Sequence, residues 1–263
     1  MTTVAAPLSQ ALNDLDRSDL VVFAGPSLVG SPLMEQAAHL LLPPVRDGDL
    51  IGACADRPPT AMLVVDGYFG AGQAVTLTEV RQVLDRGVRL YGCSSMGALR
   101  AVEARPWGMI GLGRVFTDYL TGVRTADENV VLLHDDGYRG LTAPTVNVDR
   151  LCALLEAEGV EAARCRAFGR RAAEMYFGDR SYAALRRLAA DCFDAGSGAA
   201  SGALQRVLDH LEPDRRPRWD VKRQDAEAAL EAVATGRAPT RPGAEPVPVP
   251  DVPDLLLGKG PTD

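Results

Sequence analysis

Short apolar runs alternate with segments of mixed polarity over the first half of the chain. Residues 20–24, 61–65 and 88–91 are largely apolar, and each run ends at a glycine or an Asp-Gly pair. Runs of this length between turn residues are typical of strands buried on both faces of a parallel sheet. Ser31 and Thr76 stand between the runs where helix N-caps are expected. The alternation therefore predicts βαβ units.

The remaining periodicity completes the expected elements. The helices expected in the first half span residues 31–42, 76–86, 95–105 and 114–119, and residues 129–133 are expected as one more strand. Beyond residue 147, Ala-rich segments with regularly spaced Arg and Glu predict helices over residues 149–158, 160–176, 181–193, 201–211 and 220–235. The expected fold class is α/β, with a parallel-sheet, Rossmann-like N-terminal core and a helical C-terminal part.

This pattern predicts three regions along the chain. Residues 1–146 are expected to form the α/β core, and residues 147–237 a helical C-terminal region packed on that core. Residues 238–263 carry much of the proline and are expected to be a disordered tail. Lys259 falls in this tail and is expected to be solvated.

Three loops rich in turn-forming residues follow the expected strands, at residues 25–28, 66–69 and 93–97. Open parallel sheets bind ligands beyond the carboxyl ends of their strands, so we expect these loops to share one edge. The first loop lacks both the GxGxxG and the P-loop pattern, which makes a phosphate-binding turn the weaker interpretation. Asp66 opens the second loop, where a structural hydrogen bond in a tight turn is the more ordinary expectation.

Composition narrows the class of protein. The net charge of −7 argues against a nucleic-acid binder, because phosphate contacts need clustered Lys and Arg. The five cysteines have no CxxC spacing, so they support neither a disulfide framework nor a zinc site, and a cytoplasmic location is expected. No stretch resembles a signal peptide and no apolar run reaches the length of a membrane span. No metal, cofactor or membrane contact is indicated.

Candidate nucleophiles gather in the third loop, which runs into a helix-forming sequence. Ser95 lies midway between Cys93 and Gly97, the spacing of small residues that a nucleophile elbow requires. Ser94 or Ser95 could equally be an N-cap that only satisfies the first helical N–H groups. Cys93 is another candidate nucleophile, although free cysteine is more often a buried core residue.

A serine nucleophile needs a base, and the three histidines, His39, His134 and His210, all lie outside the strand-end loops. His134 is the best placed of them. Lys222 is the more interesting base, because the chain has 26 arginines and only two lysines, and lysine can lose its proton in a buried site whereas arginine cannot. The alternative for Lys222 is a surface ion pair with Asp225, one helical turn further on.

The loops form part of an ordered set of motifs. The set comprises VFAGPSL at 22–28, Pro43-Pro44 with Gly48-Asp49, VDGYF at 65–69, SSMGALRA at 94–101 with Glu103, and GMIGLG at 108–113 with Phe116, Tyr119 and Gly122. In order and spacing it resembles the TfuA-like family over roughly residues 20–150, with a weaker echo at 220–225. TfuA-like proteins are associated with YcaO enzymes in the thioamidation of ribosomally made peptides, in which sulfur replaces a backbone amide oxygen.

The resemblance implies a hydrolase that delivers sulfur. Its substrate would be a thiocarboxylated ThiS-like carrier, and its partners a YcaO enzyme and, through that enzyme, the precursor peptide. Ser95 would attack the carrier's terminal carbonyl carbon while Lys222, neutral in a desolvated pocket, takes its proton. The oxyanion would meet the N–H groups of Met96 and Gly97.

Other residues of the strand-end loops complete this expected site: Gly25, Ser27, Asp66 and Gly67. Ser27 and Ser94 stay open as alternative nucleophiles. The second hypothesis is a non-catalytic adaptor that binds a YcaO enzyme and improves its hold on the peptide, with the glycine-rich loops as contact surface. A hydrolase requires the serine and Lys222 to lie close together, whereas an adaptor does not.

Overall fold

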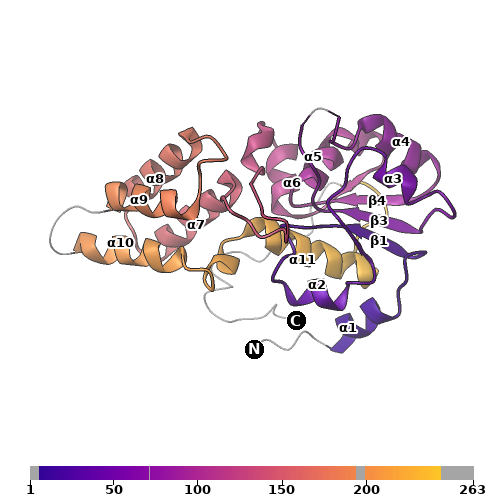
Figure 1. Cartoon of the computed structure of the whole chain (residues 1–263), viewed down its shortest axis with the longest axis horizontal. Coiled ribbons are helices and arrows are strands. Elements are labelled where there is room, and N and C mark those ends of the chain that lie inside the picture. Colours follow the sequence, from indigo (N-terminus) through magenta and orange to yellow (C-terminus); the bar gives the residue numbers. More distant parts are fainter. Residues whose placement is uncertain (1–5, 71, 194–198, 244–263) are drawn as a thin grey trace. The chain divides into compact units, whose positions relative to one another are not determined.

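The computed structural model describes residues 6–70, 72–193 and 199–243. These residues form two compact units (Figure 1). One unit takes in the described residues up to Thr125 and from Lys222 onward, and the other runs from Ala126 to Val221. The expected boundary after residue 146 falls inside the second unit, and residues 222–237 of the expected helical region are grouped with the first unit. Most of the expected proline-rich tail, from residue 244 on, lies outside the described residues.

The first unit is built on a parallel sheet, which confirms the predicted fold class. Its strands are β1 (Leu20–Phe23), β2 (Leu41–Leu42), β3 (Ala61–Val64), β4 (Arg89–Gly92) and β5 (Ile110–Gly111). They pair in the order β2-β1-β3-β4-β5, with Val22 opposite Leu63 and Leu63 opposite Tyr91. This order is that of the flavodoxin type of doubly wound sheet.

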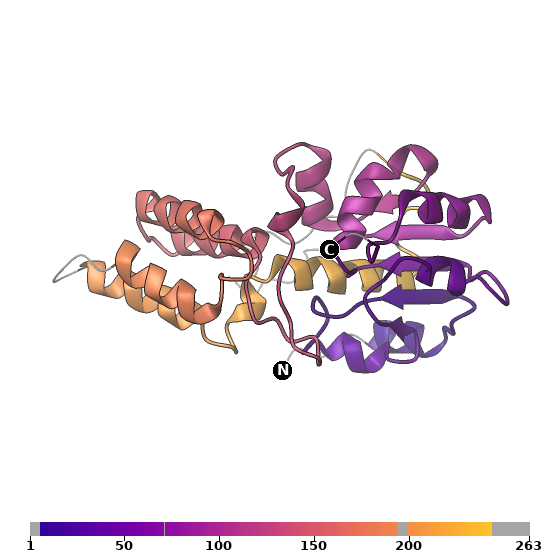
Figure 2. The ribbon, with the colours of Figure 1, turned by 45° about the horizontal axis from the view of Figure 1, so that its top comes forward.

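Helices cover both faces of the sheet (Figures 1 and 2). They are α1 (Ala6–Asn13), α2 (Pro32–Gln36), α3 (Asp49–Gly52), α4 (Leu77–Asp85), α5 (Met96–Glu103), α6 (Gly113–Leu120) and α11 (Val221–Ala234). On one face α1, α2 and α11 bury a common apolar core that includes Leu12, Leu63 and Leu230. On the other face lie α3 to α6. Burial on both faces explains the continuous apolar runs of the central strands.

Most elements expected in the first half of the chain are confirmed, but two are wrong. The helix expected over residues 31–42 ends at Gln36, because Leu41 and Leu42 leave it to pair with Val22 and Phe23 as strand β2. Ser31 is its N-cap, as expected, and accepts a hydrogen bond from the Leu33 N–H.

The strand expected over residues 129–133 is not part of the sheet. Asp127–Asn129 is a short 3₁₀ helix, and Val130 is buried in the second unit. The fifth place in the sheet belongs to Ile110 and Gly111, which pair with Tyr91 and Gly92. A strand of two residues leaves almost no periodic signal in a sequence.

The second unit is helical, as predicted. Its helices are α7 (Thr145–Ala157), α8 (Ala162–Glu174), α9 (Tyr182–Phe193) and α10 (Ala199–His210), followed by a 3₁₀ turn at Arg216–Arg218. Their apolar sides enclose a core in which the rings of Phe168 and Phe193 lie 5.6 Å apart. The indole N–H of Trp219 donates to the His210 carbonyl at 2.8 Å, which satisfies the polar atom of this buried side chain.

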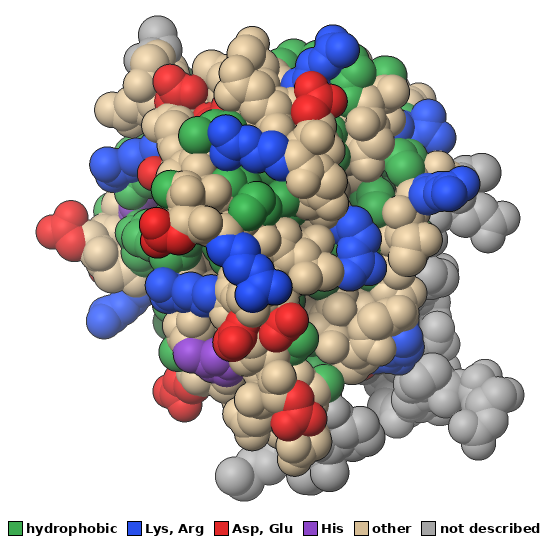
Figure 3. All heavy atoms as spheres, turned by 90° about the vertical axis from the view of Figure 1, so that its right-hand side faces the viewer, with side chains coloured by type: hydrophobic (Ala, Val, Ile, Leu, Met, Phe, Trp, Pro, Cys, Tyr) green, Lys and Arg blue, Asp and Glu red, His purple; other side chains and the backbone are tan. Residues whose placement is uncertain are grey.

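The surface shown in Figure 3 carries mixed charge. Basic side chains on that face are interspersed with acidic and hydrophobic ones instead of forming a continuous basic patch. Among the described helices, none combines the length and apolar character needed to cross a bilayer.

Helix α5 approaches the sheet most closely at Gly97. A substitution at this residue therefore tests the packing of α5 on the sheet. A Cβ at this position would lie 1.8 Å from the Val64 carbonyl oxygen. We expect Gly97→Ala to lower the free energy of unfolding by about 3 kcal/mol, measured by urea denaturation. Gly52→Ala is the control, because a Cβ there meets no atom within 4 Å, and its effect should stay within about 1 kcal/mol. Equal effects of the two substitutions would contradict this account.

Candidate active site

The candidate site lies where the strand order of the sheet reverses. The chain goes from β1 outward to β2 and returns to β3 on the other side of β1, so the carboxyl ends of β1 and β3 flank the switch point of the sheet. The loops after β1, β3 and β4 are joined there by side-chain hydrogen bonds. The expectation that these three loops share one edge is confirmed.

Asp66, directly after the buried strand β3, is the centre of this network. Its Oδ2 accepts the N–H groups of Gly25 and Ser27, each at 2.9 Å, and its Oδ1 accepts the Ser27 hydroxyl at 2.7 Å. The residue is only 3% exposed. Asp66 thus accepts structural hydrogen bonds, as expected, and these bonds join its own loop to the loop after β1. These bonds also occupy the N–H groups that a phosphate-binding turn at residues 25–28 would need.

Ser94 is the serine of the β4–α5 corner that joins the network. Its hydroxyl donates to the Ser27 Oγ at 2.9 Å, and both residues are buried. Its φ of +65° is unusual for a residue with a side chain. The N–H of Ser95 donates to the Cys93 carbonyl at 2.7 Å and closes a strained three-residue turn around Ser94. Such a turn is what a nucleophile elbow requires.

Ser95, the predicted nucleophile, occupies the N-cap position of α5. Its side chain makes no capping hydrogen bond, so the interpretation of Ser95 as a side-chain cap is not supported. Of the two predicted oxyanion donors, the Gly97 N–H donates to the Val65 carbonyl at 3.3 Å. The N–H of Met96 has no acceptor within the described part of the chain.

Lys222 is a buried residue of helix α11, with its side chain only 3% exposed. Its Nζ lies 4.0 Å from Asp66 Oδ1, the oxygen that also accepts the Ser27 hydroxyl. The alternative of a surface ion pair with Asp225 is wrong, because Lys222 and Asp225 are both buried. The described structure thus links Ser94, Ser27, Asp66 and Lys222 in one chain of short contacts.

Asp225 instead caps helix α6. Its Oδ1 accepts the Arg114 N–H at 2.9 Å and its Oδ2 accepts the Val115 N–H at 2.7 Å. Complete burial raises the pKa of this carboxyl to about 7, against the lowering effect of the two N–H groups. A capping carboxylate far along the chain from its helix has no local sequence signal.

The side chains of Cys93 and the histidines take no part in the hydrogen bonds that join Ser94, Ser27 and Asp66. The Cys93 thiol is completely buried, and burial, with the nearby carboxylates of Asp225 and Asp66, raises its pKa well above the ordinary value. His39 contacts the carbonyls of Leu12 and Leu15 through Nε2, at 3.1 Å each. His134 and His210 belong to the second unit.

Gly67 packs tightly at the same edge of the sheet. A Cβ there would lie 2.8 Å from Val45 Cγ1 and from Met96 Cγ. A side chain at residue 67 would therefore collide with Val45 and Met96, so the absence of a side chain at Gly67 lets the β3 loop pack against the start of α5.

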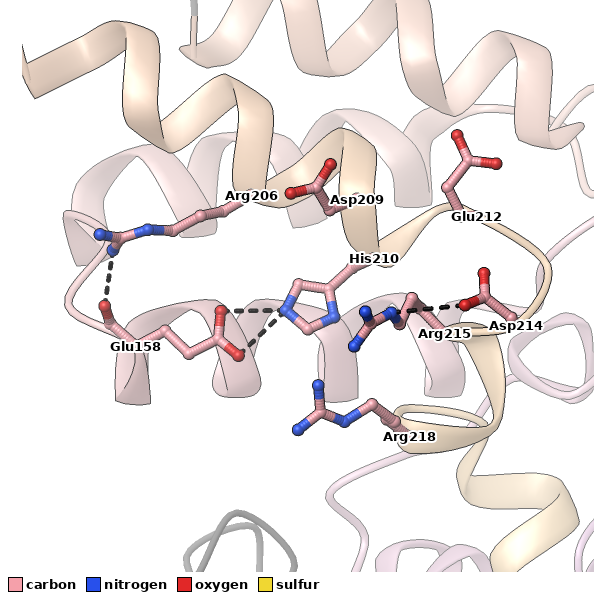
Figure 4. A pocket seen from close by; sticks show the side chains of 8 residues that line it. All are labelled: Glu158, Arg206, Asp209, His210, Glu212, Asp214, Arg215 and Arg218. Carbon is pink, nitrogen blue, oxygen red and sulfur yellow. Dashed lines mark hydrogen bonds and ion pairs between the residues drawn. The ribbon is translucent and has the colours of Figure 1, made fainter. Parts of the chain in front are cut away.

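A pocket of about 470 Å³ in the second unit contains none of the predicted site residues (Figure 4). His210 contacts the Glu158 carboxylate through Nε2 at 2.9 and 3.1 Å, and Arg206 donates to the Glu158 carbonyl at 2.7 Å. Arg215 pairs with Asp214 at 3.5 Å. Acidic and basic groups line this pocket together, so its charges largely offset one another.

The fold and the site define an α/β protein with a buried serine, carboxylate and lysine network at the switch point of a doubly wound sheet. Residues 66–181 match the family model described as TfuA-like protein. This match, over less than half of the chain, confirms the resemblance to the TfuA-like family seen in the motifs. No curated protein matches the chain.

The surroundings of Cys93 predict that its thiol is unreactive in the folded protein. At pH 8 we expect iodoacetamide to modify Cys93 at least about 100-fold more slowly than Cys192, which is only half-buried, because a buried thiol with a raised pKa has little thiolate. Peptide mass spectrometry of the labelled protein measures both rates, and labelling in denaturant should equalise them. Rapid labelling of Cys93 in the folded protein would contradict this prediction and make Cys93 a candidate nucleophile again.

Proposed function

We propose that the chain is a serine hydrolase that releases sulfide from a thiocarboxylated, ThiS-like carrier protein and supplies it to a YcaO enzyme. The observation that carries the proposal is the strained corner at Ser94, whose hydroxyl is hydrogen-bonded through Ser27 to Asp66, with Lys222 at 4.0 Å from the same carboxylate. Backbone strain of this kind persists at functional sites because the surrounding structure maintains it.

Ser94 is the proposed nucleophile, in preference to Ser95. Its oxygen forms an ester bond to the carrier's terminal carbonyl carbon, and the carbon–sulfur bond breaks to release sulfide. Water then hydrolyses the ester, which restores the serine and leaves a carboxylate on the carrier. Ser94 is completely buried, so the reaction requires that carrier binding exposes it.

The hydrogen bonds from Ser94 through Ser27 to Asp66 indicate the direction in which the serine proton moves. Ser94 donates to Ser27, which donates to Asp66, so the Ser94 proton moves to Ser27 as the Ser27 proton moves toward the Asp66–Lys222 pair. Lys222 enters this step as a neutral amine and finally holds the proton. A desolvated lysine loses its proton readily, and three hydrogen bonds disperse the charge of the neighbouring Asp66.

The oxyanion of the tetrahedral intermediate is assigned to the N–H of Met96. This N–H begins helix α5, and the positive end of the helix dipole favours negative charge there. The Gly97 N–H, the other donor first considered, is already bonded to the Val65 carbonyl.

The identity of carrier and partner rests on the TfuA-like family match. TfuA-like proteins work with YcaO enzymes in peptide thioamidation, which requires a source of sulfide. A hydrolase that acts only on a thiocarboxylated carrier would keep sulfide production tied to the partner that consumes it. The precursor peptide is then engaged through the YcaO enzyme.

Two serine variants distinguish the proposed nucleophile from its neighbour. We expect Ser94→Ala to reduce sulfide release from a thiocarboxylated carrier at least about 10³-fold, because the attacking oxygen is lost. Ser95→Ala should stay within about tenfold of the wild type. Sulfide is measured directly, and carrier mass reports the exchange of sulfur for oxygen.

The opposite ranking of these two variants would assign the chemistry to Ser95. Absence of sulfide release by the wild type, together with binding to a YcaO enzyme, would favour the adaptor function. Circular dichroism and urea unfolding of each variant exclude loss of the fold as the cause.

Substitution of Lys222 tests whether it acts as a base or only as an ion-pair partner of Asp66. Lys222→Arg keeps the positive charge but cannot give a neutral base, so we expect a loss of sulfide release at least about 10²-fold. Lys222→Met, of similar size and without charge, should lose as much. Retained activity in the arginine variant alone would leave Lys222 as a counter-ion of Asp66 and move the base elsewhere.

A further inference from the structure

Asp225 lies on α11 one helical turn beyond Lys222 and has no part in the proposed chemistry. It is 0% exposed, and its two carboxylate oxygens accept the N–H groups of Arg114 and Val115 in the first turn of α6. These hydrogen bonds join segments that are 110 and 111 positions apart in the sequence. A buried carboxylate with two such bonds is a strong and directional contact.

Gly113 makes room for this contact. Its φ is +89°, a conformation that favours glycine, and a Cβ on it would lie 2.4 Å from the Asp225 Cγ. The first turn of α6 can therefore receive the carboxylate only because residue 113 has no side chain.

The position of α6 gives the contact a consequence for the candidate site. Helix α6 begins directly after strand β5, at the edge of the sheet where the loops of Ser94 and Asp66 lie. The Asp225 carboxylate thus holds α11 to this edge at one point, and Lys222 contacts Asp66 one turn earlier. A small rotation of α11 about its axis would break both contacts together.

We infer that Asp225 is a positioning residue. Its two hydrogen bonds to the first turn of α6, called the clamp below, set the rotation of α11 about its axis and so direct Lys222 toward Asp66. This inference rests on the proposed function only for its catalytic consequence. The orientation of Lys222 can be measured without any hydrolysis.

The charges around Asp225 give the clamp a dependence on pH. Arg114 and Asp118 of α6 influence the carboxyl, Cys93 lies near it, and Lys222 shares its helix. Burial raises the pKa of Asp225 to about 7, so the protonated form gains population as the pH falls through 7. A protonated carboxyl offers fewer acceptor sites to the two N–H groups, and the clamp weakens on the acid side.

Because the chain has few lysines, NMR can follow the surroundings of Lys222 directly. The chain has only Lys222 and Lys259, so ¹³C labelling of lysine side chains gives two NMR signals, which Lys222→Arg assigns. Asp225→Asn leaves one acceptor oxygen for two N–H donors. Glu227→Gln is the matched control, because Glu227 lies on the same helix and pairs with Arg223 at 2.8 Å.

We expect Asp225→Asn to shift the Lys222 signal and to accelerate amide exchange of Arg114 and Val115 at least about tenfold, with Lys259 unchanged. Glu227→Gln should leave the Lys222 signal in place. In the wild type, the Lys222 signal should move with a midpoint near pH 7. This movement can be measured even if Asp225→Asn fails to fold. If the variant folds, the movement should be absent from it.

An unchanged Lys222 signal in Asp225→Asn, with faster exchange at Arg114 and Val115, would overturn the inference and leave Asp225 as a helix cap. A wild-type Lys222 signal that does not move near pH 7 would overturn it as well. Failure of the proposed function has a different signature, because a wild type without sulfide release leaves these NMR results unaffected.

Discussion

The buried carboxylate of Asp66 is the interaction on which the candidate site depends. An ionised group in a protein interior is costly unless hydrogen bonds and opposite charge compensate it. Gly25 and Ser27, both of the β1 loop, provide three hydrogen bonds, and Lys222 of the distant helix α11 lies 4.0 Å from Oδ1. The need to satisfy one carboxylate therefore fixes the β1 loop against the β3 loop and draws a buried lysine to the same edge.

The strain at Ser94 depends on the packing beneath it. Gly97 lies so close to Val64 that no larger residue fits, and the α5 helix starts directly over the sheet. The chain has to turn from β4 into α5 within very few residues, which forces Ser94 to a φ of +65°. The tight packing of helix α5 on the sheet compensates the conformational cost at Ser94. The strained conformation holds the Ser94 hydroxyl against Ser27.

Sequence reasoning was effective wherever the signal was local. Apolar runs, N-caps and helix periods predicted the central strands and nearly all the helices, and the strand-end rule placed three loops at one edge. It failed for β2 and β5, whose two residues each are defined only by their pairing partners. It did not predict the partners of Asp66, Ser94 and Asp225, because these contacts join segments 39 to 111 positions apart. No local pattern distinguishes Ser94 from Ser95.

The site extends beyond the segment that matches the TfuA-like family model. Residues 66–181 contain Asp66 and Ser94, whereas Ser27 precedes that segment and Lys222 follows it. The matched segment alone therefore holds the strained serine and the carboxylate but neither the relay hydroxyl nor the lysine. The loop after β1 and helix α11 complete the network from either side of that segment, so the proposed chemistry is a property of the whole first unit.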